Sequence, residues 1–354
     1  MPRLLPSIII TMPLVISTAV QASVDEKIKQ LEARIDQLES GQRPTSEPVG
    51  INVYGSFRPA LTYKQDNRED NDSLDITDFF SRLGLRGSQP VGETLQAFFQ
   101  GEWDIDIEAD SDFGDARLAY AGIESNYGRL AIGKQWNAHY NLVAAPTDIF
   151  NHRSSPFGYD DFSPFRTNNY VHYQIETNGI RYELGVQVDG DPETPNGGVN
   201  SASNPDNVDS IDTGVHFNTD IFSVAFSFRQ VKYSGDRDDD RILGVAGSIQ
   251  LNDSVYLAST YQDIDINNND GHTLDLVGSY KVNEQITFKG GLFSVDDGVD
   301  GDASRERIGF NATVEKQLTE QVRIHVEWLH NDFDATDSVD TLSFGIRYDF
   351  ERTF

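Results

Sequence analysis

The sequence predicts an all-β protein: a 16-stranded antiparallel transmembrane β-barrel, preceded by a short α-helical coiled-coil segment. Apolar and polar residues alternate with a period of two in one window after another from residue 49 to the C-terminus, as they do in β-strands. There are sixteen windows, an even number, and most span about ten residues. Short and long connectors alternate between them. A soluble β-sandwich shares the alternating residues, but it has no reason to segregate its short connectors from its long ones.

Composition excludes several classes of protein. The 354 residues include no cysteine, which excludes a disulfide scaffold and a cysteine-ligated zinc or iron–sulfur site. Asp and Glu number 57 against 28 Lys and Arg, a formal net charge of -29, and such a chain would repel nucleic acid. Because 38% of the residues are hydrophobic and 11% are aromatic, the acidic groups decorate a folded body rather than a disordered chain.

Residues 1–22 are expected to be a secretory signal peptide. Arg3 precedes an apolar stretch that ends in small residues, and cleavage is expected between Ala22 and Ser23. The alternative is an uncleaved anchor helix, which the short stretch and its two prolines disfavour. The mature protein is therefore expected to work outside the cytoplasm.

Residues 23–40 are expected to form a coiled-coil helix. Apolar residues recur there at alternating spacings of four and three, at Val24, Ile28, Leu31, Ile35 and Leu38. Almost all other positions are charged or Gln, so a lone helix would leave its apolar stripe exposed. The alternative is a single amphipathic helix that lies against the body of the protein. Residues 41–48 then form a polar linker that contains two prolines.

The barrel is expected to occupy residues 49–354, with one face of each strand apolar and the other polar. In one window Phe222, Val224, Phe226 and Phe228 alternate with small residues and an arginine. The sixteen windows are 50–63, 77–88, 94–106, 115–124, 128–135, 167–176, 179–188, 209–218, 220–232, 240–251, 253–263, 271–282, 285–294, 304–317, 320–331 and 338–350.

The connectors indicate which end of each strand faces which side of the membrane. The tight turns include Asn178-Gly179, Asn218-Thr219-Asp220, Asn252-Asp253, Asn283-Glu284 and Thr319-Glu320. The long connectors, rich in Asp, Asn and Gly, include 189–208, 263–270 and 295–303. Short periplasmic turns opposite long external loops are typical of outer-membrane barrels, and sixteen strands leave an aqueous lumen.

Five sequence motifs resemble those of the Gram-negative general (diffusion) porins. They are Tyr54-Gly55, the run Ser-Arg-Leu-Gly-Leu-Arg-Gly at 81–87, Arg-Leu-Ala-Tyr-Ala-Gly-Ile at 117–123, Tyr-Gly-Arg-Leu-Ala-Ile-Gly-Lys-Gln at 127–135, and the terminal Phe354. The resemblance spans essentially all of residues 49–354. It implies a homotrimer of 16-stranded barrels in the outer membrane of a Gram-negative bacterium, each with its own pore and a third external loop folded inward as a constriction.

The resemblance also implies that small hydrophilic solutes and ions diffuse passively through the pore. The N-terminal helix differs from the enteric members, which begin with the first strand, and is similar to the coiled-coil extension of some other porin groups, including phosphate-selective ones. Phe354 resembles the terminal aromatic residue that serves the family as an assembly signal.

The longest connector, residues 137–165, follows the fifth strand and is expected to be the constriction loop. Its acidic residues are Asp148, Asp160 and Asp161. In the family such acids face basic residues on the opposite wall, and motif matching assigns Arg82, Lys134 and Arg166 to that wall.

Strand alternation offers an independent test of these basic residues. Arg82 and Arg86 face inward because Leu83 and Leu85 must face lipid, and Arg58 is inward by the same test. On the lipid face a charge would cost about 2–4 kcal/mol near the midplane. Lys134 fails the test, because it shares its side with residues that face lipid. It reaches the lumen only if the strand has already bent inward into the loop.

No enzyme, cofactor or resident metal is expected. The sequence contains none of the common hydrolase, metalloprotease or nucleotide-binding motifs, and its seven histidines are scattered. Two acidic runs, 236–240 and 296–302, are similar to calcium loops, but the second has no Glu at the twelfth position of an EF-hand. Solvated loops, or loops bridged to lipopolysaccharide phosphates by divalent cations, are the favoured interpretation.

Ion preference is expected to be weak and toward cations, because basic and acidic wall residues roughly cancel while the loops are acidic. Two alternatives stay open. The channel could select a substrate, either an anion such as phosphate or an oligosaccharide guided by Tyr54, Phe98, Tyr159 and Tyr170. The barrel could instead anchor a structural tether whose helix contacts peptidoglycan.

Overall fold

The structure is a computed structural model, and it describes residues 50–108, 113–152, 165–188, 208–233 and 238–354. The expected signal peptide, coiled-coil helix and linker lie outside the described residues. Within them, no helix is long and apolar enough to cross a membrane.

The described chain is built almost entirely of β-strands. They are β1 (Gly50–Phe57), β2 (Pro59–Asp66), β3 (Asn71–Asp78), β4 (Arg82–Pro90), β5 (Leu95–Ile105), β6 (Phe113–Ser125), β7 (Gly128–Trp136), β8 (Arg166–Thr167), β9 (Tyr170–Thr177), β10 (Ile180–Gln187), β11 (Ser210–Asn218), β12 (Phe222–Val231), β13 (Asp240–Asn252), β14 (Val255–Ile266), β15 (Asn269–Lys281), β16 (Ile286–Asp296), β17 (Arg307–Gln317), β18 (Val322–Phe333) and β19 (Val339–Thr353). Two short helical turns, η1 (Tyr140–Ala144) and η3 (Gly301–Ala303), interrupt the strands.

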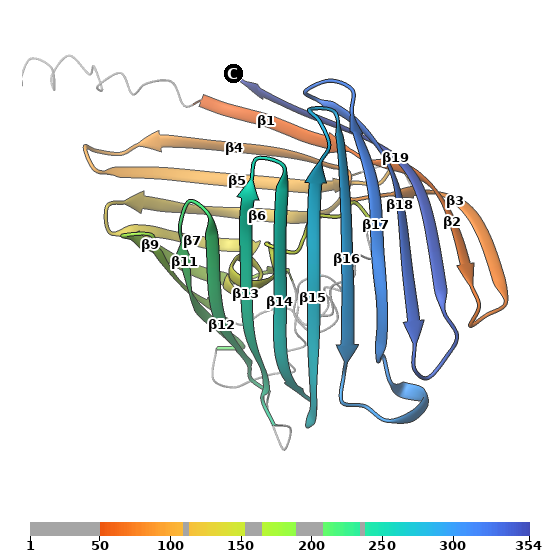
Figure 1. Cartoon of the computed structure of the whole chain (residues 1–354). Helices are drawn as coiled ribbons and strands as arrows, with labels where there is room; N and C mark the ends of the chain where they lie inside the picture. The colour runs from red at the N-terminus through yellow and green to blue at the C-terminus, as the bar shows by residue number, and fades with distance from the viewer. Residues whose placement is uncertain (1–49, 109–112, 153–164, 189–207, 234–237) are drawn as a thin grey trace, which may run out of the picture. The chain divides into compact units, whose positions relative to one another are not determined.

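These segments close into a 16-stranded antiparallel barrel (Figure 1). β1 and β2 both pair with β19, one after the other, and together form one long strand. On the other side, β4 pairs with β1 and β3 pairs with β2, so β3 and β4 also count as one strand. β8 is a two-residue bridge to the end of β7. The barrel closes where β1 pairs with β19, with Gly55 opposite Phe350. The predicted fold class is confirmed, and every one of the sixteen predicted windows contains a strand.

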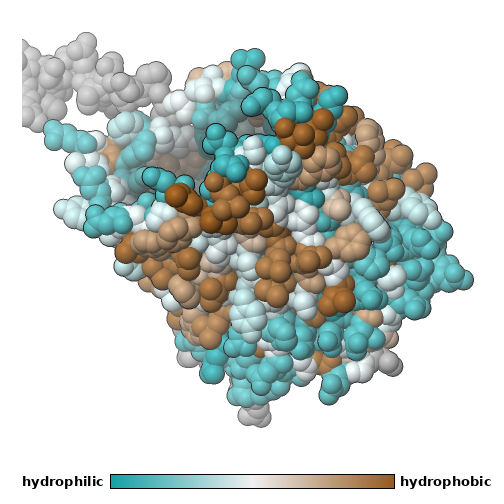
Figure 2. All heavy atoms as spheres, viewed as in Figure 1, coloured by the Kyte–Doolittle hydropathy of each residue, from teal (hydrophilic) through white to brown (hydrophobic). Residues whose placement is uncertain are grey.

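The barrel wall is apolar outside and polar inside. In β12 the side chain of Phe226 is 52% exposed while its neighbour Ser227 is 5% exposed, the reverse of a soluble protein. Apolar side chains gather across the middle of the visible face, and polar ones gather toward its lower edge (Figure 2). An apolar band between polar ends is the surface that a bilayer requires.

Most connectors have the predicted length, but two do not. The connector left between the first two predicted windows, 64–76, is mostly taken up by the ends of β2 and β3. Asn178 and Gly179 form the predicted tight turn with φ values of 53° and 77°. Residues 263–270, predicted to be a long loop, instead extend β14 and β15, which are joined by Asn267 and Asn268 at φ values of 54° and 63°. Asn tolerates the left-handed region better than other residues that carry a side chain, so these two residues make a hairpin turn.

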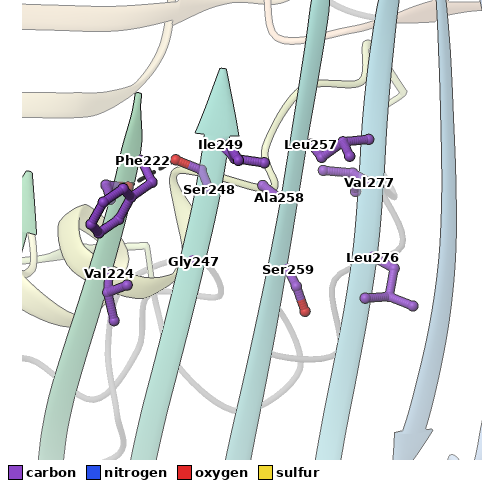
Figure 3. A pocket seen from close by; sticks show the side chains of 11 residues that line it. Phe222, Val224, Gly247, Ser248, Ile249, Leu257, Ala258, Ser259, Leu276 and Val277 are labelled. Carbon is purple, nitrogen blue, oxygen red and sulfur yellow. Dashed lines mark hydrogen bonds between the residues drawn. The ribbon is translucent and has the colours of Figure 1, made fainter. Parts of the chain in front are cut away.

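A shallow groove of about 470 Å³ crosses the wall from β12 to β15 (Figure 3). Gly247 and Ser259 lie opposite each other in the register of β13 and β14, and both belong to the outward-facing series. Larger residues, among them Val224 and Leu276, flank them. Small outward-facing residues therefore leave a shallow depression in the outer surface, and the strands beneath it remain paired.

Gly133 is the glycine whose replacement is expected to damage folding most clearly. It has a φ of 126°, and a Cβ there would lie 2.2 Å from the backbone oxygen of Ala119. We expect Gly133→Ala to reduce the yield of heat-modifiable folded barrel on unheated gels severalfold. Gly247→Ala, whose Cβ would meet nothing closer than 3.7 Å, should fold normally. Equal folding of the two variants would contradict the prediction.

Candidate functional site: the pore constriction

The segment after β7 folds into the barrel, as predicted for a constriction loop (Figure 1). It begins at Asn137, and η1 packs Leu142 and Val143 against Ala225 of β12 and Ala246 of β13. Small inward residues make this approach possible. A Cβ on Gly214 would lie 2.4 Å from the end of the Leu142 side chain, so the absence of a side chain at Gly214 leaves room for Leu142.

Hydrogen bonds from the opposite strands fix the loop backbone to the wall. The Thr260 hydroxyl donates to the Val143 carbonyl at 2.8 Å, and the Tyr256 hydroxyl donates to the Pro146 carbonyl at 2.7 Å. Lys289 Nζ donates to the Ile149 carbonyl at 2.9 Å. Because these donors come from β14 and β16, the loop is held across the barrel from the strand that it leaves.

Glu327 of β18 holds the next part of the loop. Its carboxylate accepts hydrogen bonds from the backbone N–H groups of Asn151 at 3.0 Å and His152 at 2.7 Å, and from the Thr313 hydroxyl at 2.7 Å. The side chain is 1% exposed. The structure therefore uses the charge of this wall residue to bind the loop.

His139 lies fully buried between the loop and the wall. Its Nε2 donates to Gln262 Oε1 at 2.6 Å, and Gln262 is oriented by donating through its own nitrogen to Thr273. The Ser227 hydroxyl donates to His139 Nδ1 at 2.6 Å. Burial lowers the pKa of His139 to about 4, so the ring is neutral at pH 7 and both nitrogens are satisfied.

The loop and the opposite wall enclose a cavity of about 270 Å³, which we call the constriction cavity. Asp148, Ile149 and Phe150 line it from the loop. Six basic side chains line it from the strands and their junctions, and these are Arg58, Arg82, Arg117, Arg166, Lys289 and Arg347. Among the described lining residues Asp148 carries the one carboxylate. An acidic loop therefore faces a basic wall, the arrangement that the family resemblance implies.

Carboxylates that pair with the basic side chains, but do not line the cavity themselves, neutralise much of this positive charge. Arg117 binds Glu102 at 2.7 Å and Asp104 at 2.9 Å. Lys289 binds Glu315 at 3.0 Å, and Arg347 binds Asp349 at 2.8 Å. These four acids contact the basic groups and are absent from the lining of the cavity, so the cavity surface is more basic than the wall as a whole.

Arg58 and Arg166 differ from the other wall cations. Within the described ranges no carboxylate lies at ion-pair distance from either guanidinium. Arg58 Nε donates to the Ser56 hydroxyl at 2.8 Å, and the Arg166 guanidinium carbon lies 5.0 Å from the centroid of the Trp136 ring. A guanidinium on an aromatic face or a hydroxyl keeps its full charge available to an ion in the pore.

Asp148 supplies the opposing charge. Its carboxylate accepts a hydrogen bond from the Tyr140 hydroxyl at 2.7 Å and is otherwise exposed. The charged groups that act on it most strongly are Arg58, Arg82 and Arg117. A negative loop and a positive wall across a narrow gap create a transverse field, which favours polar solutes over apolar ones of similar size.

The structure therefore brings together four of the sequence-predicted residues: Asp148, Arg58, Arg82 and Arg166 all line the constriction cavity. Arg86 does not line it. It faces the lumen nearer the tight turns, where it binds Glu351 at 2.6 Å and lies over the Tyr54 ring. Asp160 and Asp161 lie outside the described residues.

Lys134 is also absent from the lining of the constriction cavity. The preceding Gly133 takes a positive φ of 126°, but β7 continues through it to Trp136. The charged groups that act on Lys134 are Arg166, Asp115 and Asp104. Gln135, the next residue, is buried like Ala131, so Lys134 keeps the parity of the exposed Ile132 and stays a prediction as a constriction residue.

Arg117 is the lining residue that strand alternation misassigns. It shares its parity with Ala119 and Ala121, which are exposed on the outer face. However, β6 carries a bulge at this point, since Glu102 pairs with Leu118 while Trp103 pairs with Ala116. The extra residue turns Arg117 into the lumen. A charged residue on the lipid face of an otherwise regular strand was the available signal.

A break between β3 and β4 positions two further residues of the constriction. Asp78 accepts the Ser81 N–H at 2.9 Å, and Phe80 takes a positive φ of 66°. Phe80 thereby lies under the Arg117 guanidinium at 5.3 Å. Phe79, which is fully buried, contacts His152 of the loop at a ring distance of 4.9 Å.

The acidic loop runs show no metal site among the described residues. Asp297 instead orders its own loop, because its carboxylate accepts the backbone N–H groups of Val299 at 3.2 Å and Arg305 at 2.9 Å. In the other run, Asp240 accepts the Asn267 N–H at 3.0 Å. Both carboxylates are used in loop structure.

Comparison with known proteins places this architecture in a family. A family model described as Gram-negative porin matches residues 15–336. Porin-like protein L of Photobacterium profundum is 24% identical over 331 residues, covering 86% of this chain and 93% of that protein. An outer membrane porin protein of Bordetella pertussis is 27% identical over 198 residues, and the match covers 51% of this chain and 51% of that relative's length.

Solved structures share the fold at low identity. Salmonella typhi OmpF in complex with daunomycin aligns with a TM-score of 0.69 at 16% identity, covering 85% of this chain and 97% of that one. The anion-selective porin from Comamonas acidovorans aligns with a TM-score of 0.66 at 18% identity, covering 85% and 100%. The closed barrel, its inward loop and the family match agree, and this chain belongs to the Gram-negative porin family.

Proposed function

We propose that the protein is a passive channel of the outer membrane for small hydrophilic solutes and ions, and that it has no enzymatic step. The observation that carries this proposal is the constriction cavity, where Asp148 faces Arg58 and Arg82 across the lumen of a closed barrel. Such a site polarises water and solutes but provides no nucleophile held by a base.

Three further properties, predicted from the family resemblance, the acidic loops and the heptad pattern, belong to the same proposal. The barrel assembles as a homotrimer, a state supported by the solved OmpT of Vibrio cholerae, which is described in a trimer form. Its outer loops contact lipopolysaccharide, with divalent cations as bridges between acidic loops and phosphates. The N-terminal residues 23–40 associate as a coiled coil and contact peptidoglycan through their charged face.

Planar-bilayer recording tests the channel function directly. The purified protein should give stepwise conductance increments in simple salts, with the currents of different ions roughly following their mobilities. An assembled barrel that inserts without conducting would overturn the proposal. Deleting residues 24–40 separates the channel from the tether alternative, because conductance should persist, whereas attachment of the envelope would be lost if the helix is a tether.

We propose that Phe354 acts as an assembly signal at the end of the last strand. Its backbone N–H donates to the Ile51 carbonyl at 2.9 Å, so the terminal residue takes part in closing the barrel, while its ring is exposed. Removing Phe354 is expected to lower the amount of assembled barrel at the cell surface severalfold. Phe354→Tyr, which keeps an aromatic end, should assemble normally. Normal surface levels of the truncated chain would contradict this role.

A further inference from the structure

A second cavity of about 240 Å³ lies in the lumen, apart from the constriction cavity. Arg129 and Arg181 line it, and each is the second residue of its strand, β7 and β10, directly after a tight turn. The cavity is therefore nearer the tight-turn end of the barrel than the constriction. Trp136 lines both cavities, so the two cavities lie next to each other in the lumen.

Arg129 is held by aromatic rings more than by acid. Its guanidinium carbon lies 4.0 Å from the centroid of the Phe98 ring and 5.6 Å from that of Tyr120. Among the described residues its nearest carboxylate is Glu124, at 4.0 Å, and that side chain is 54% exposed. Ring faces fix the position of a guanidinium without using its N–H groups, which stay available to an anion.

The one carboxylate that lines this cavity, that of Glu183, already has partners within the protein. Glu183 is 2% exposed, and its carboxylate binds Arg181 Nε at 2.9 Å, His172 Nε2 at 2.9 Å and Asn141 Nδ2 at 3.0 Å. Two arginines and one carboxylate line the cavity, so its lining carries one positive charge in excess, and the carboxylate nearest Arg129, Glu124 at 4.0 Å, lies outside the lining.

The remaining lining combines flat apolar surface with amide groups. The rings of Tyr120 and Trp136 provide the apolar sides, and Gln135 and Gln174 provide the amides. A guanidinium presents paired N–H groups that match the two oxygens of a carboxylate. The volume limits the occupant to a small molecule.

We propose that this cavity is a binding subsite for small organic monocarboxylates with a flat apolar body, held by Arg129. The inference rests on the proposed channel function, which brings solutes into the lumen. It makes the lumen more than a passive sieve, because a carboxylate would pause there after crossing the constriction.

Calorimetry on the assembled protein in detergent tests the subsite without requiring conduction. Benzoate is the probe, and benzamide is its neutral counterpart of nearly the same shape. Benzoate should bind with a measurable affinity that benzamide lacks. Arg129→Gln should weaken benzoate binding by at least about tenfold, the effect of losing hydrogen bonds to a charged group. Inorganic phosphate that binds as tightly as benzoate would show a general anion site and overturn the carboxylate assignment.

Arg86→Gln is the matched control, since it removes the same charge from the same end of the lumen but does not touch the cavity. It should leave benzoate affinity within about twofold of the unmodified protein. Equal losses in Arg86→Gln and Arg129→Gln would show a diffuse field effect and overturn the proposal. If Arg129→Gln fails to assemble, Arg129→Lys, which keeps the charge but loses the paired N–H groups, and the benzamide comparison test the same point. Failure of conductance with intact benzoate binding would contradict the channel function alone.

Discussion

Replacing Glu327 with alanine is expected to free the middle of the constriction loop and change the conductance of the pore. The carboxylate binds two backbone N–H groups of the loop and the Thr313 hydroxyl, all within 3.0 Å. Hydrogen bonds to a charged group contribute about 1.5–3 kcal/mol each to stability. Losing all of them together should release this segment of the loop from the wall. The donors would be left buried and unpaired.

The change should be local. Thr260, Tyr256 and Lys289 still hold the loop backbone at Val143, Pro146 and Ile149, so the part of the loop nearer β7 stays in place. We expect single-channel recordings of Glu327→Ala to show larger and noisier steps, because residues 151 and 152 can leave the wall. The folded barrel should still be heat-modifiable on gels.

Two further variants make the interpretation specific. Glu327→Gln keeps one oxygen acceptor but loses the charge, so its conductance should lie between those of the alanine variant and the unmodified protein. Glu351→Ala removes an acid that pairs with Arg86 and contacts no described part of the loop, and it should leave the conductance steps quiet. Quiet, unchanged steps in Glu327→Ala would show that the clamp is unnecessary.

The strands could be predicted because the membrane and the lumen impose opposite solvents on the two faces of each strand. In β12 every second residue had to be apolar, and the structure exposes Phe222 and Phe226 while burying Ala225 and Ser227. Which face of a strand a residue lies on depends on that strand alone, so the alternation can be recognised in the sequence of a single strand. The fold class followed from repeating that signal sixteen times.

Other features depend on pairs of strands and could not be read from one. The bulge that turns Arg117 inward exists because β5 pairs with residues on both sides of it, Leu118 and Ala116. The tight turn at Asn267 and Asn268 depends on two strands extending past their predicted ends. Likewise, no local pattern showed that Glu327 would bind a loop 175 residues away.

The type of site, an acidic loop that faces a basic wall, could be predicted from the sequence, but only some of its residues could. Motif matching and alternation together placed Arg58, Arg82, Arg166 and Asp148 in the constriction cavity. Inward arginines of the later strands were harder to assign to the cavity, because strand alternation shows which face a residue is on but not its height along the lumen. Arg347 of β19 and Arg229 of β12 are examples. Arg347 lines the cavity, whereas Arg229, also inward by parity, is fully buried against Asp212.

The second large effect is expected in ion preference, which we propose to be weakly cationic at low salt. At physiological ionic strength the field of a loop carboxylate decays over about 8 Å, and at 1 M over about 3 Å. The acidic mouth therefore loses influence as salt rises, while the charges that line the constriction cavity stay within reach of the ion. Since Arg58 and Arg166 face no carboxylate at ion-pair distance among the described residues, the remaining preference should move toward anions.

Reversal potentials in a salt gradient, measured near 0.1 M and near 1 M, check this balance. Asp148→Asn should shift the reversal potential toward the anion side at both concentrations, because it removes the described acid of the cavity. Arg58→Gln and Arg166→Gln should shift it toward the cation side. Glu69→Gln, which changes an exposed acid between β2 and β3, should have a small effect at low salt and none at high salt.

The sign of the ion preference at low salt decides whether the channel is weakly cation-selective. If the unmodified channel prefers anions near 0.1 M, the wall arginines outweigh the acidic mouth even when the mouth acts at full range. If Asp148→Asn also leaves the potential unchanged, the loop carboxylate does not meet the permeating ion at all. In that case its hydrogen bond from Tyr140, at 2.7 Å, would be its main role, and selectivity would reside in the arginines alone.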